Sequence, residues 1–112
     1  MIDSYTFGRI VIDGESYNSD VIIYSDNVDY NWWRKESHLL QKDDLSDIIN
    51  YEPEILIVGT GDPGLMQVTE ETIRFLKSKG IKLIVDITEN ACKTYNELKK
   101  NKKVIAALHL TC

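Results

Sequence analysis

The 112-residue sequence is poor in the residues that mark several protein classes, with two cysteines, two prolines and two histidines. Cys92 and Cys112 form neither a disulfide framework nor a Cys-x-x-Cys pair, so a reducing environment is expected. No apolar run approaches the roughly 18 residues of a membrane-spanning helix, and residues 1–5 lack the basic and apolar regions of a secretory signal. These absences predict a soluble, cytoplasmic protein with no membrane partner.

Recognisable catalytic and metal-binding patterns are also missing. The sequence contains no nucleophile elbow, no zinc-protease histidine pair and no zinc-finger spacing. His109 and Cys112 supply only two ligands, too few for a metal site, and Cys92 is interpreted either as a small core residue or as a thiol activated near a helix start. The acidic pairs at 43–44 and 70–71 fit the first turns of helices. We therefore expect no catalytic residue, no metal and no cofactor.

Charge is spread unevenly along the chain. The net charge is −5, but residues 13–62 hold 12 of the 18 acids and only three bases, which gives that stretch −9. Residues 63–112 carry +4, and their densest basic cluster, residues 99–103, is typical of the end of a helix. An acidic protein without a basic face repels a phosphate backbone, so nucleic acid is not an expected partner.

The apolar pattern predicts a single α/β domain spanning residues 1–112. Asp13-Gly14 is a strong two-residue turn signal, so residues 5–12 and 17–24 are expected to form an N-terminal β-hairpin. After an irregular stretch and a short helix near residues 45–49, strands and helices alternate. The expected order is a strand at 55–58, a helix from 69, a strand at 81–85, a helix from 88 and a strand at 104–108. This βαβαβ order predicts a parallel core, which the hairpin extends or flanks as part of a mixed sheet.

A glycine-rich loop follows the first of these strands. Gly59-Thr60-Gly61-Asp62-Pro63-Gly64 matches G-x-G-x-x-G, and Asp86 ends the next strand, where a dinucleotide fold places its ribose-binding acid. Pro63 and the short chain disfavour a dinucleotide site. The glycines are interpreted either as turn residues with positive φ or as a site for an anion or a nucleotide-like small molecule. The candidate ligand-binding residues are Gly59, Thr60, Gly61, Asp62 and Asp86.

A second candidate site is the unusual run that begins with two tryptophans. Neighbouring side chains of an extended segment point in opposite directions, so one of the two tryptophans is expected to be exposed. An exposed tryptophan beside arginine is typical of a protein–protein hot spot. In the alternative interpretation one tryptophan covers the core and the other packs on the loop. The candidate partner-binding residues are Trp32, Trp33, Arg34, Lys35 and His38.

Together, these features resemble a small single-domain family of unknown function (the Mth-type domain). The resemblance is carried by Phe7-Gly8, Gly14, Tyr17, Trp33-Arg34-Lys35, His38, Val58-Gly59-Thr60-Gly61, Thr88, Ala91, Tyr95-Asn96 and Ala106-Ala107-Leu108-His109-Leu110-Thr111-Cys112. It covers nearly the whole chain and is greatest to archaeal members, while eukaryotic relatives include mitochondrial complex I assembly factor 3 and an adipogenesis-associated cytosolic protein. It implies a three-layer α/β fold with a mixed central sheet, no established enzymatic activity and no catalytic residues to transfer.

The sequence therefore predicts a non-enzymatic domain that acts through protein–protein interaction or assembly, with an unknown protein as partner. The alternative is small-ligand binding at the glycine loop, at the carboxyl ends of the parallel strands.

Overall fold

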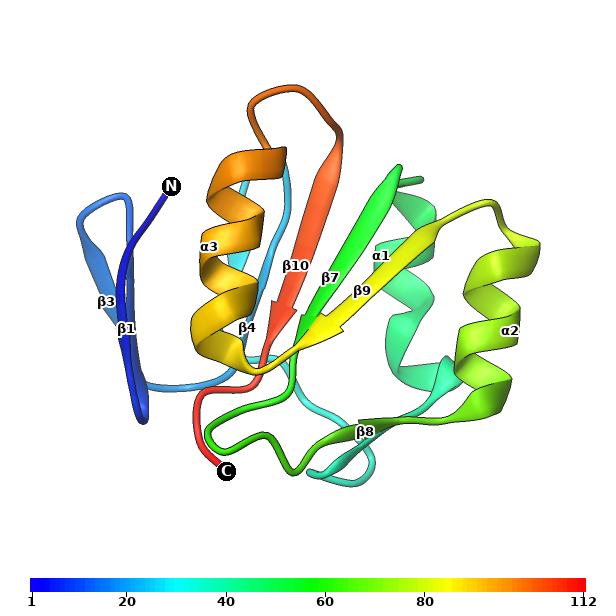
Figure 1. Cartoon of the computed structure of the whole chain (residues 1–112), viewed down its shortest axis with the longest axis horizontal. Helices are drawn as coiled ribbons and strands as arrows, with labels where there is room; N and C mark the ends of the chain where they lie inside the picture. Colours follow the sequence, from blue (N-terminus) through cyan, green and yellow to red (C-terminus); the bar gives the residue numbers. More distant parts are fainter.

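A five-stranded mixed sheet forms the centre of the computed structural model, which describes residues 1–112 (Figure 1). The strands in spatial order are β5 (Val28–Asp29), β4 (Val21–Ile23), β10 (Val104–Leu108), β7 (Ile55–Gly59) and β9 (Lys82–Asp86). Strands β10, β7 and β9 are parallel, whereas β4 pairs antiparallel with β10 and β5 with β4. The predicted parallel βαβαβ core within a mixed sheet is confirmed.

Strands β7 and β10 are buried on both faces, which explains their continuous apolar sequences. Alternate residues of β7 enter different cores: Ile55 and Ile57 lie on one face, and Leu56 and Val58 on the other. Helix α3 (Thr88–Leu98) and the N-terminal strands cover the first face. The second face is covered by a 3₁₀ turn η1 (Lys42–Leu45), α1 (Ser46–Asn50), α2 (Glu70–Ser78) and the chain leading into them. The result is the three-layer arrangement that the resemblance implied.

The N-terminal hairpin was predicted only in part. Strands β1 (Ile2–Thr6), β2 (Arg9–Ile12) and β3 (Glu15–Tyr17) form a separate antiparallel sheet, with Asp13-Gly14 as the predicted turn between β2 and β3. The expectation that residues 21–24 belong to the returning strand is wrong. Residues 21–23 leave this sheet and pair with β10 in the central one.

Helices α2 and α3 begin at, or within one residue of, the positions expected from the sequence. Thr69 caps α2, because its hydroxyl oxygen accepts a hydrogen bond from the backbone N–H of Thr72 at 3.1 Å. Helix α3 begins at Thr88, the residue expected from the sequence, and Thr88 is its first helical residue and not its cap. Its buried hydroxyl instead donates to the carbonyl oxygen of His109 at 2.6 Å, which ties α3 to the end of β10.

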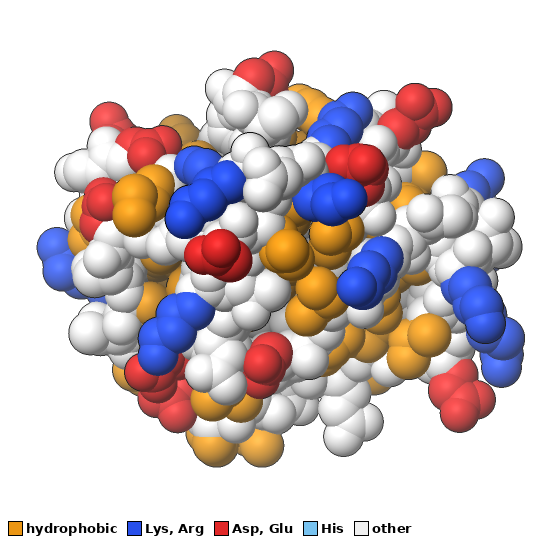
Figure 2. Space-filling view, turned by 45° about the horizontal axis from the view of Figure 1, so that its top comes forward, with side chains coloured by type: hydrophobic (Ala, Val, Ile, Leu, Met, Phe, Trp, Pro, Cys, Tyr) orange, Lys and Arg blue, Asp and Glu red, His pale blue; other side chains and the backbone are white.

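Several connections meet at the carboxyl ends of the parallel strands, at the lower edge of Figure 1. The glycine loop, the C-terminal residues and the short pair β6 (Leu39–Leu40) and β8 (Gln67–Val68) all lie there. Figure 2 brings the opposite edge forward, where basic side chains lie among acidic ones without forming one continuous patch. None of the helices combines the length and the apolar character needed to cross a membrane.

Candidate functional site

The glycines of the loop after β7 serve close packing and turn geometry. Gly59 sits so near α3 and β10 that a Cβ there would lie 2.8 Å from the Thr88 hydroxyl and 2.9 Å from Leu108. Gly61 and Gly64 have φ angles of +105° and +109°, a backbone region that favours glycine. The turn interpretation therefore accounts for Gly61 and Gly64, and close approach accounts for Gly59.

The amides of this loop already have partners within the chain. The N–H groups of Asp62 and Leu65 donate to the carbonyl oxygens of Thr111 and Cys112, each at 3.0 Å. The N–H of Gly61 donates to the Thr88 hydroxyl at 2.8 Å. An anion bound by these amides would therefore have to displace the carbonyl oxygens of Thr111 and Cys112 and the hydroxyl of Thr88.

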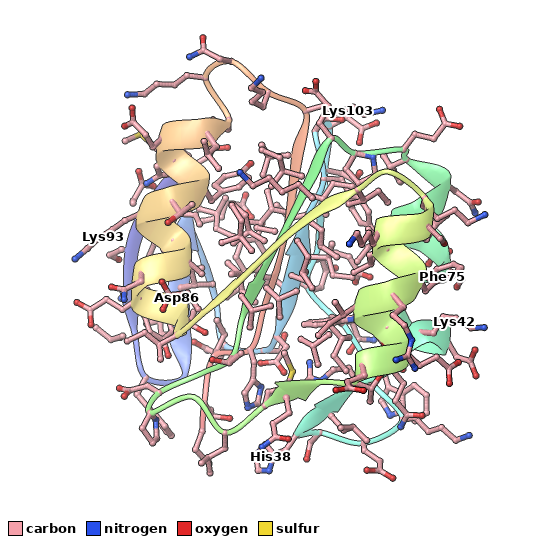
Figure 3. The ribbon with its side chains drawn as sticks, turned by 45° about the vertical axis from the view of Figure 1, so that its right-hand side comes forward. His38, Lys42, Phe75, Asp86, Lys93 and Lys103 are labelled. Carbon is pink, nitrogen blue, oxygen red and sulfur yellow. The ribbon has the colours of Figure 1, made fainter.

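Asp86 is the last residue of β9 and lies beside the first turn of α3 (Figure 3). Its backbone contacts the glycine loop, whereas its carboxylate contacts the start of α3. Its backbone oxygen accepts hydrogen bonds from the N–H and the hydroxyl of Thr60, at 2.9 and 3.1 Å. The carboxylate accepts from the N–H of Ile87 at 2.8 Å and from the side chain of Asn90 at 3.3 Å. These bonds organise the start of α3 around the Asp86 carboxylate.

The tryptophan segment alternates between buried and exposed side chains. Trp32 and Arg34 point inward, and only 8% and 7% of their surfaces are exposed. The Arg34 guanidinium lies 4.4 Å from the centre of the Trp32 ring, a cation–π contact. Trp33, between them, is 76% exposed, and Lys35 and His38 are exposed as well. The prediction that one tryptophan is exposed is confirmed, whereas Arg34 is not a surface residue.

A buried ionic cluster holds this segment against β4 and β10. Nη2 of Arg34 donates to Oδ2 of Asp20 at 2.8 Å and to the carbonyl oxygen of Ser37 at 2.8 Å. Nδ1 of His109 lies 2.8 Å from the same carboxylate oxygen, and the second oxygen accepts the N–H of Leu110 at 2.8 Å. Asp20 therefore joins three segments that are far apart in the sequence. Arg34, Asp20 and His109 are called the ionic cluster below.

The proton positions in the ionic cluster follow from its geometry. A carboxylate only accepts hydrogen bonds, so the short contact between Asp20 and His109 requires a hydrogen on Nδ1. Nη2 of Arg34, 3.1 Å from that nitrogen, is then a neighbouring donor and not a hydrogen-bond partner. Burial raises the pKa of Asp20, but the hydrogen bonds from His109, Leu110 and Arg34 outweigh it and hold the pKa below its ordinary value.

The ionic cluster has features of an acid–base pair but lacks a group for it to act on. A carboxylate that orients an imidazole leaves Nε2 as the reactive nitrogen. Nε2 of His109 and Nη1 of Arg34 are both buried without a hydrogen-bond partner, so no nucleophile of the chain lies within reach of the imidazole. The His38 ring packs edge-on against His109, with the ring centres 5.7 Å apart. The observed contacts hold the tryptophan segment, residues 32–38, in place against the central sheet.

The glycine loop and the tryptophan segment both lie next to His109. A Cβ on Gly61 would lie 2.9 Å from the His109 ring, and His109 contacts Arg34 through the ionic cluster. From the sequence, His109 was considered only as one of two ligands of an incomplete metal site. Asp20 was missed altogether, and the one available signal was the presence of an arginine, which needs an acid if it is buried.

The side chain of Cys92 is buried in the core. Burial raises the pKa of the Cys92 thiol to about 12, which contradicts the interpretation of Cys92 as an activated thiol. No group of three or more His, Cys, Asp or Glu side chains is placed to hold a metal ion.

Comparison with known proteins identifies the family. Residues 2–109 match the sequence pattern of a family described as "Protein of unknown function (DUF498/DUF598)". The chain belongs to this family. As a DUF498/DUF598 member it is an α/β domain of unknown function, and the resemblance seen in the sequence is confirmed.

Its relatives carry names of different kinds. The chain is 27% identical over 107 residues to "NADH dehydrogenase [ubiquinone] 1 alpha subcomplex assembly factor 3" of Xenopus tropicalis, covering 95% of this chain and 58% of that protein. The chain thus spans little more than half the length of that relative. It is 30% identical to the "13 kDa major membrane protein" of Francisella tularensis, with coverage of 93% and 85%.

A solved structure supports the same fold. The conserved hypothetical protein PH1505 of Pyrococcus horikoshii superposes with a TM-score of 0.87 at 26% identity, covering 100% of this chain and 99% of that one. The DUF498/DUF598 fold is therefore retained where about three quarters of the aligned residues differ.

Proposed function

We propose that residues 1–112 act as one domain that binds another protein through the surface around Trp33, without catalysing a reaction of its own. The observation that carries this proposal is the setting of Trp33, which is 76% exposed between two buried neighbours. A large apolar side chain in water is unfavourable, and tryptophan is the residue most enriched in protein–protein hot spots. The surface formed by Trp33, Lys35 and His38 is called the Trp33 surface below.

The buried neighbours make Trp33 a preorganised contact. Trp32 stacks under Arg34, and Arg34 is fixed by Asp20 and by the carbonyl oxygen of Ser37. The backbone on both sides of Trp33 is therefore held before any partner arrives. Less conformational entropy is lost on binding when the contact is fixed in advance, so one exposed tryptophan can contribute much of the affinity.

The names of the relatives support an interaction role. One relative is named an assembly factor, and an assembly factor acts by contacting other proteins.

The free thiols of Cys92 and Cys112 fit a reducing compartment, and we propose the cytoplasm as the location. The alternative, an anion at the glycine loop, would require the amides of residues 61, 62 and 65 to exchange their present partners.

Affinity capture with a matched pair of variants tests the proposal. Tagged wild type, Trp33→Ala and Phe7→Ala are expressed at equal levels in the source organism, and captured proteins are quantified by mass spectrometry. Phe7 is the control because it is a large apolar residue that is 58% exposed outside the Trp33 surface. We expect Trp33→Ala to lose at least one partner that Phe7→Ala retains, with the melting temperature unchanged. Identical capture by all three proteins would contradict the proposal.

A further inference from the structure

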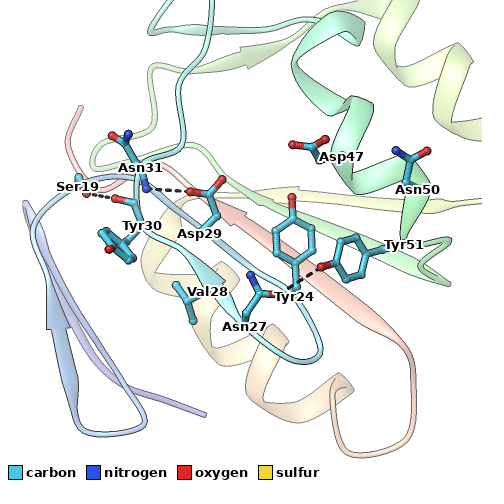
Figure 4. A pocket seen from close by; sticks show the side chains of 10 residues that line it. All are labelled: Ser19, Tyr24, Asn27, Val28, Asp29, Tyr30, Asn31, Asp47, Asn50 and Tyr51. Carbon is cyan, nitrogen blue, oxygen red and sulfur yellow. Dashed lines mark hydrogen bonds between the residues drawn. The ribbon is translucent and has the colours of Figure 1, made fainter.

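A cavity of about 740 Å³ lies between the turn joining β4 to β5 and helix α1, next to the tryptophan segment (Figure 4). Ten residues line it, and none of them is Lys, Arg or His. Two of the ten are acids, Asp29 and Asp47, and neither forms an ion pair within the chain. The cavity is thus a negatively charged recess without a counter-charge of its own.

Stacked tyrosines form one wall of the recess. The rings of Tyr24 and Tyr51 are 4.2 Å apart between centres, and the Tyr51 hydroxyl donates to Asn27 at 3.3 Å. Tyr24 is only 6% exposed, and its hydroxyl points into the cavity toward Asp47 (Figure 4). The structure gives this hydroxyl no hydrogen-bond partner within the chain. The side chain of Tyr24 is therefore held in place by its burial, while its hydroxyl faces the cavity and is free to hydrogen-bond to a polar ligand there.

Electrostatics agree with this placement. Burial, together with the carboxylates of Asp47 and Asp29, raises the pKa of Tyr24 to about 12. The two carboxylates therefore act on the space in front of the Tyr24 hydroxyl, where they favour a positive charge.

The lining suits a flat organic cation better than a metal ion. Two carboxylates fall short of the three-ligand group that a metal requires, and no such group is present. Aromatic faces attract cations, and the side-chain oxygens of Asn31 and Asn50 add acceptors around the rim. A guanidinium group offers five N–H donors in one plane and stacks on aromatic rings.

We propose that this cavity, here called the tyrosine pocket, receives an arginine side chain of the partner protein. The inference rests on the proposed function, because Tyr30 and Asn31 of the pocket lead directly into the segment that presents Trp33. A partner that covers Trp33 therefore reaches the tyrosine pocket with an adjacent part of its chain. The acidic recess supplies charge complementarity, and Trp33 supplies the apolar contact.

Titration of the ¹⁵N-labelled full chain with N-acetyl-L-arginine methylamide tests the proposal. The citrulline analogue is the matched ligand, since it has nearly the same shape without the charge. We expect the arginine compound to shift the backbone amide signals of residues lining the tyrosine pocket in a saturable way, and the citrulline analogue to leave them unchanged. Equal binding of both ligands, or no shift at the pocket, would overturn the proposal.

Variants and further probes make the test specific. Asp47→Asn is expected to weaken binding about fivefold, the upper range for a partly exposed ion pair. Asp43→Asn, which removes an exposed acid outside the pocket, should leave affinity within twofold of wild type. If Asp47→Asn binds the arginine compound as tightly as wild type does, the assignment of the site is refuted. Should Asp47→Asn alter the dispersed amide spectrum, Asp29→Asn replaces it, because the new amide oxygen can still accept the N–H of Asn31.

Two other cations test whether the pocket prefers a free small molecule or an ammonium group to the arginine side chain of a protein. Agmatine tests for a free small-molecule ligand, and N-acetyl-L-lysine methylamide tests for an ammonium group. We expect agmatine to bind no more tightly than the arginine compound, and the lysine compound to bind more weakly than it. Tighter binding of agmatine would indicate a metabolite site, and equal binding of the lysine compound would reject the guanidinium assignment. None of these measurements needs the partner, so their outcome is independent of the capture experiment with Trp33→Ala.

Discussion

Nη2 of Arg34 lies 2.8 Å from Oδ2 of Asp20, and this ion pair fixes the tryptophan segment to the start of β4. Only 3% of the Arg34 side chain and 17% of the Asp20 side chain are exposed to solvent. Two charges withdrawn from water this far depend strongly on each other, because either one alone would be buried without compensation. The position of Trp33 on the surface is therefore linked to a carboxylate 13 residues earlier in the chain.

Asp20→Asn is expected to lower the free energy of unfolding by about 3 kcal/mol at pH 7, since it leaves the Arg34 charge buried without its counter-ion. Urea denaturation followed by circular dichroism measures the change. Asp26→Asn serves as the control, because Asp26 is exposed and forms no ion pair within the chain. A loss below about 1 kcal/mol for Asp20→Asn would show that the ionic cluster contributes little.

The same variant has a predicted pH dependence. The folded protein lowers the pKa of Asp20 below its ordinary value of 3.8, so the carboxylate contributes stability that is fully present above pH 3.8. This contribution is lost as the pH falls through the folded pKa. The difference in stability between wild type and Asp20→Asn should be constant from pH 7 to pH 5 and should shrink as the pH falls below 3.8. A difference that persists unchanged at lower pH would contradict this assignment.

Fluorescence distinguishes the two adjacent tryptophans. In Trp32→Phe the emission comes from Trp33, which is 76% exposed, and in Trp33→Phe it comes from Trp32, which is 8% exposed. We expect acrylamide to quench the first variant strongly and the second weakly, with a red-shifted emission maximum only in the first. Similar quenching in both would mean that the segment does not alternate as described.

The sequence was sufficient where the apolar pattern decides the structure. The run at residues 55–58 predicted a strand, and the structure has β7 there with all five of its residues buried. Residues 21–24 carry the same continuous apolar pattern, and their assignment to the returning hairpin strand missed that residues 21–23 belong to the central sheet. The turn at Asp13-Gly14 was visible because short-range turn chemistry fixes it.

The candidate site was less accessible because its contacts are long-range. Asp20 and His109 are 89 residues apart, and no local pattern links a carboxylate after a loop to a histidine at the end of the last strand. The alternation of residues 32–35 predicted one exposed tryptophan, but which of the two is buried depends on the position of Asp20. The tyrosine pocket combines the turn after β4 with the end of α1, two segments that are distant in the sequence and meet through the stacked rings of Tyr24 and Tyr51.

Alanine substitutions at Gly14 and Gly61 distinguish the stability cost of a left-handed backbone from the cost of a steric clash. Gly14 and Gly61 both have positive φ, but a Cβ on Gly14 meets nothing within 4 Å, whereas one on Gly61 would lie 2.1 Å from the carbonyl oxygen of Thr111. Gly14→Ala should cost about 1 kcal/mol of stability from the left-handed backbone, and Gly61→Ala about 1–3 kcal/mol more from overpacking. Thermal denaturation of both variants provides the comparison. Equal costs would mean that the C-terminal residues do not fill the glycine loop.

Contact between Trp33 and a partner is measured most directly by photo-crosslinking in the source cells. A photoreactive benzoylphenylalanine replaces Trp33 in one variant and Phe7 in another, and the adducts are identified by mass spectrometry after irradiation. We predict that position 33 gives a discrete adduct with one protein and that position 7 does not. If position 33 yields no adduct beyond those seen at position 7, the Trp33 surface is not a partner-binding site.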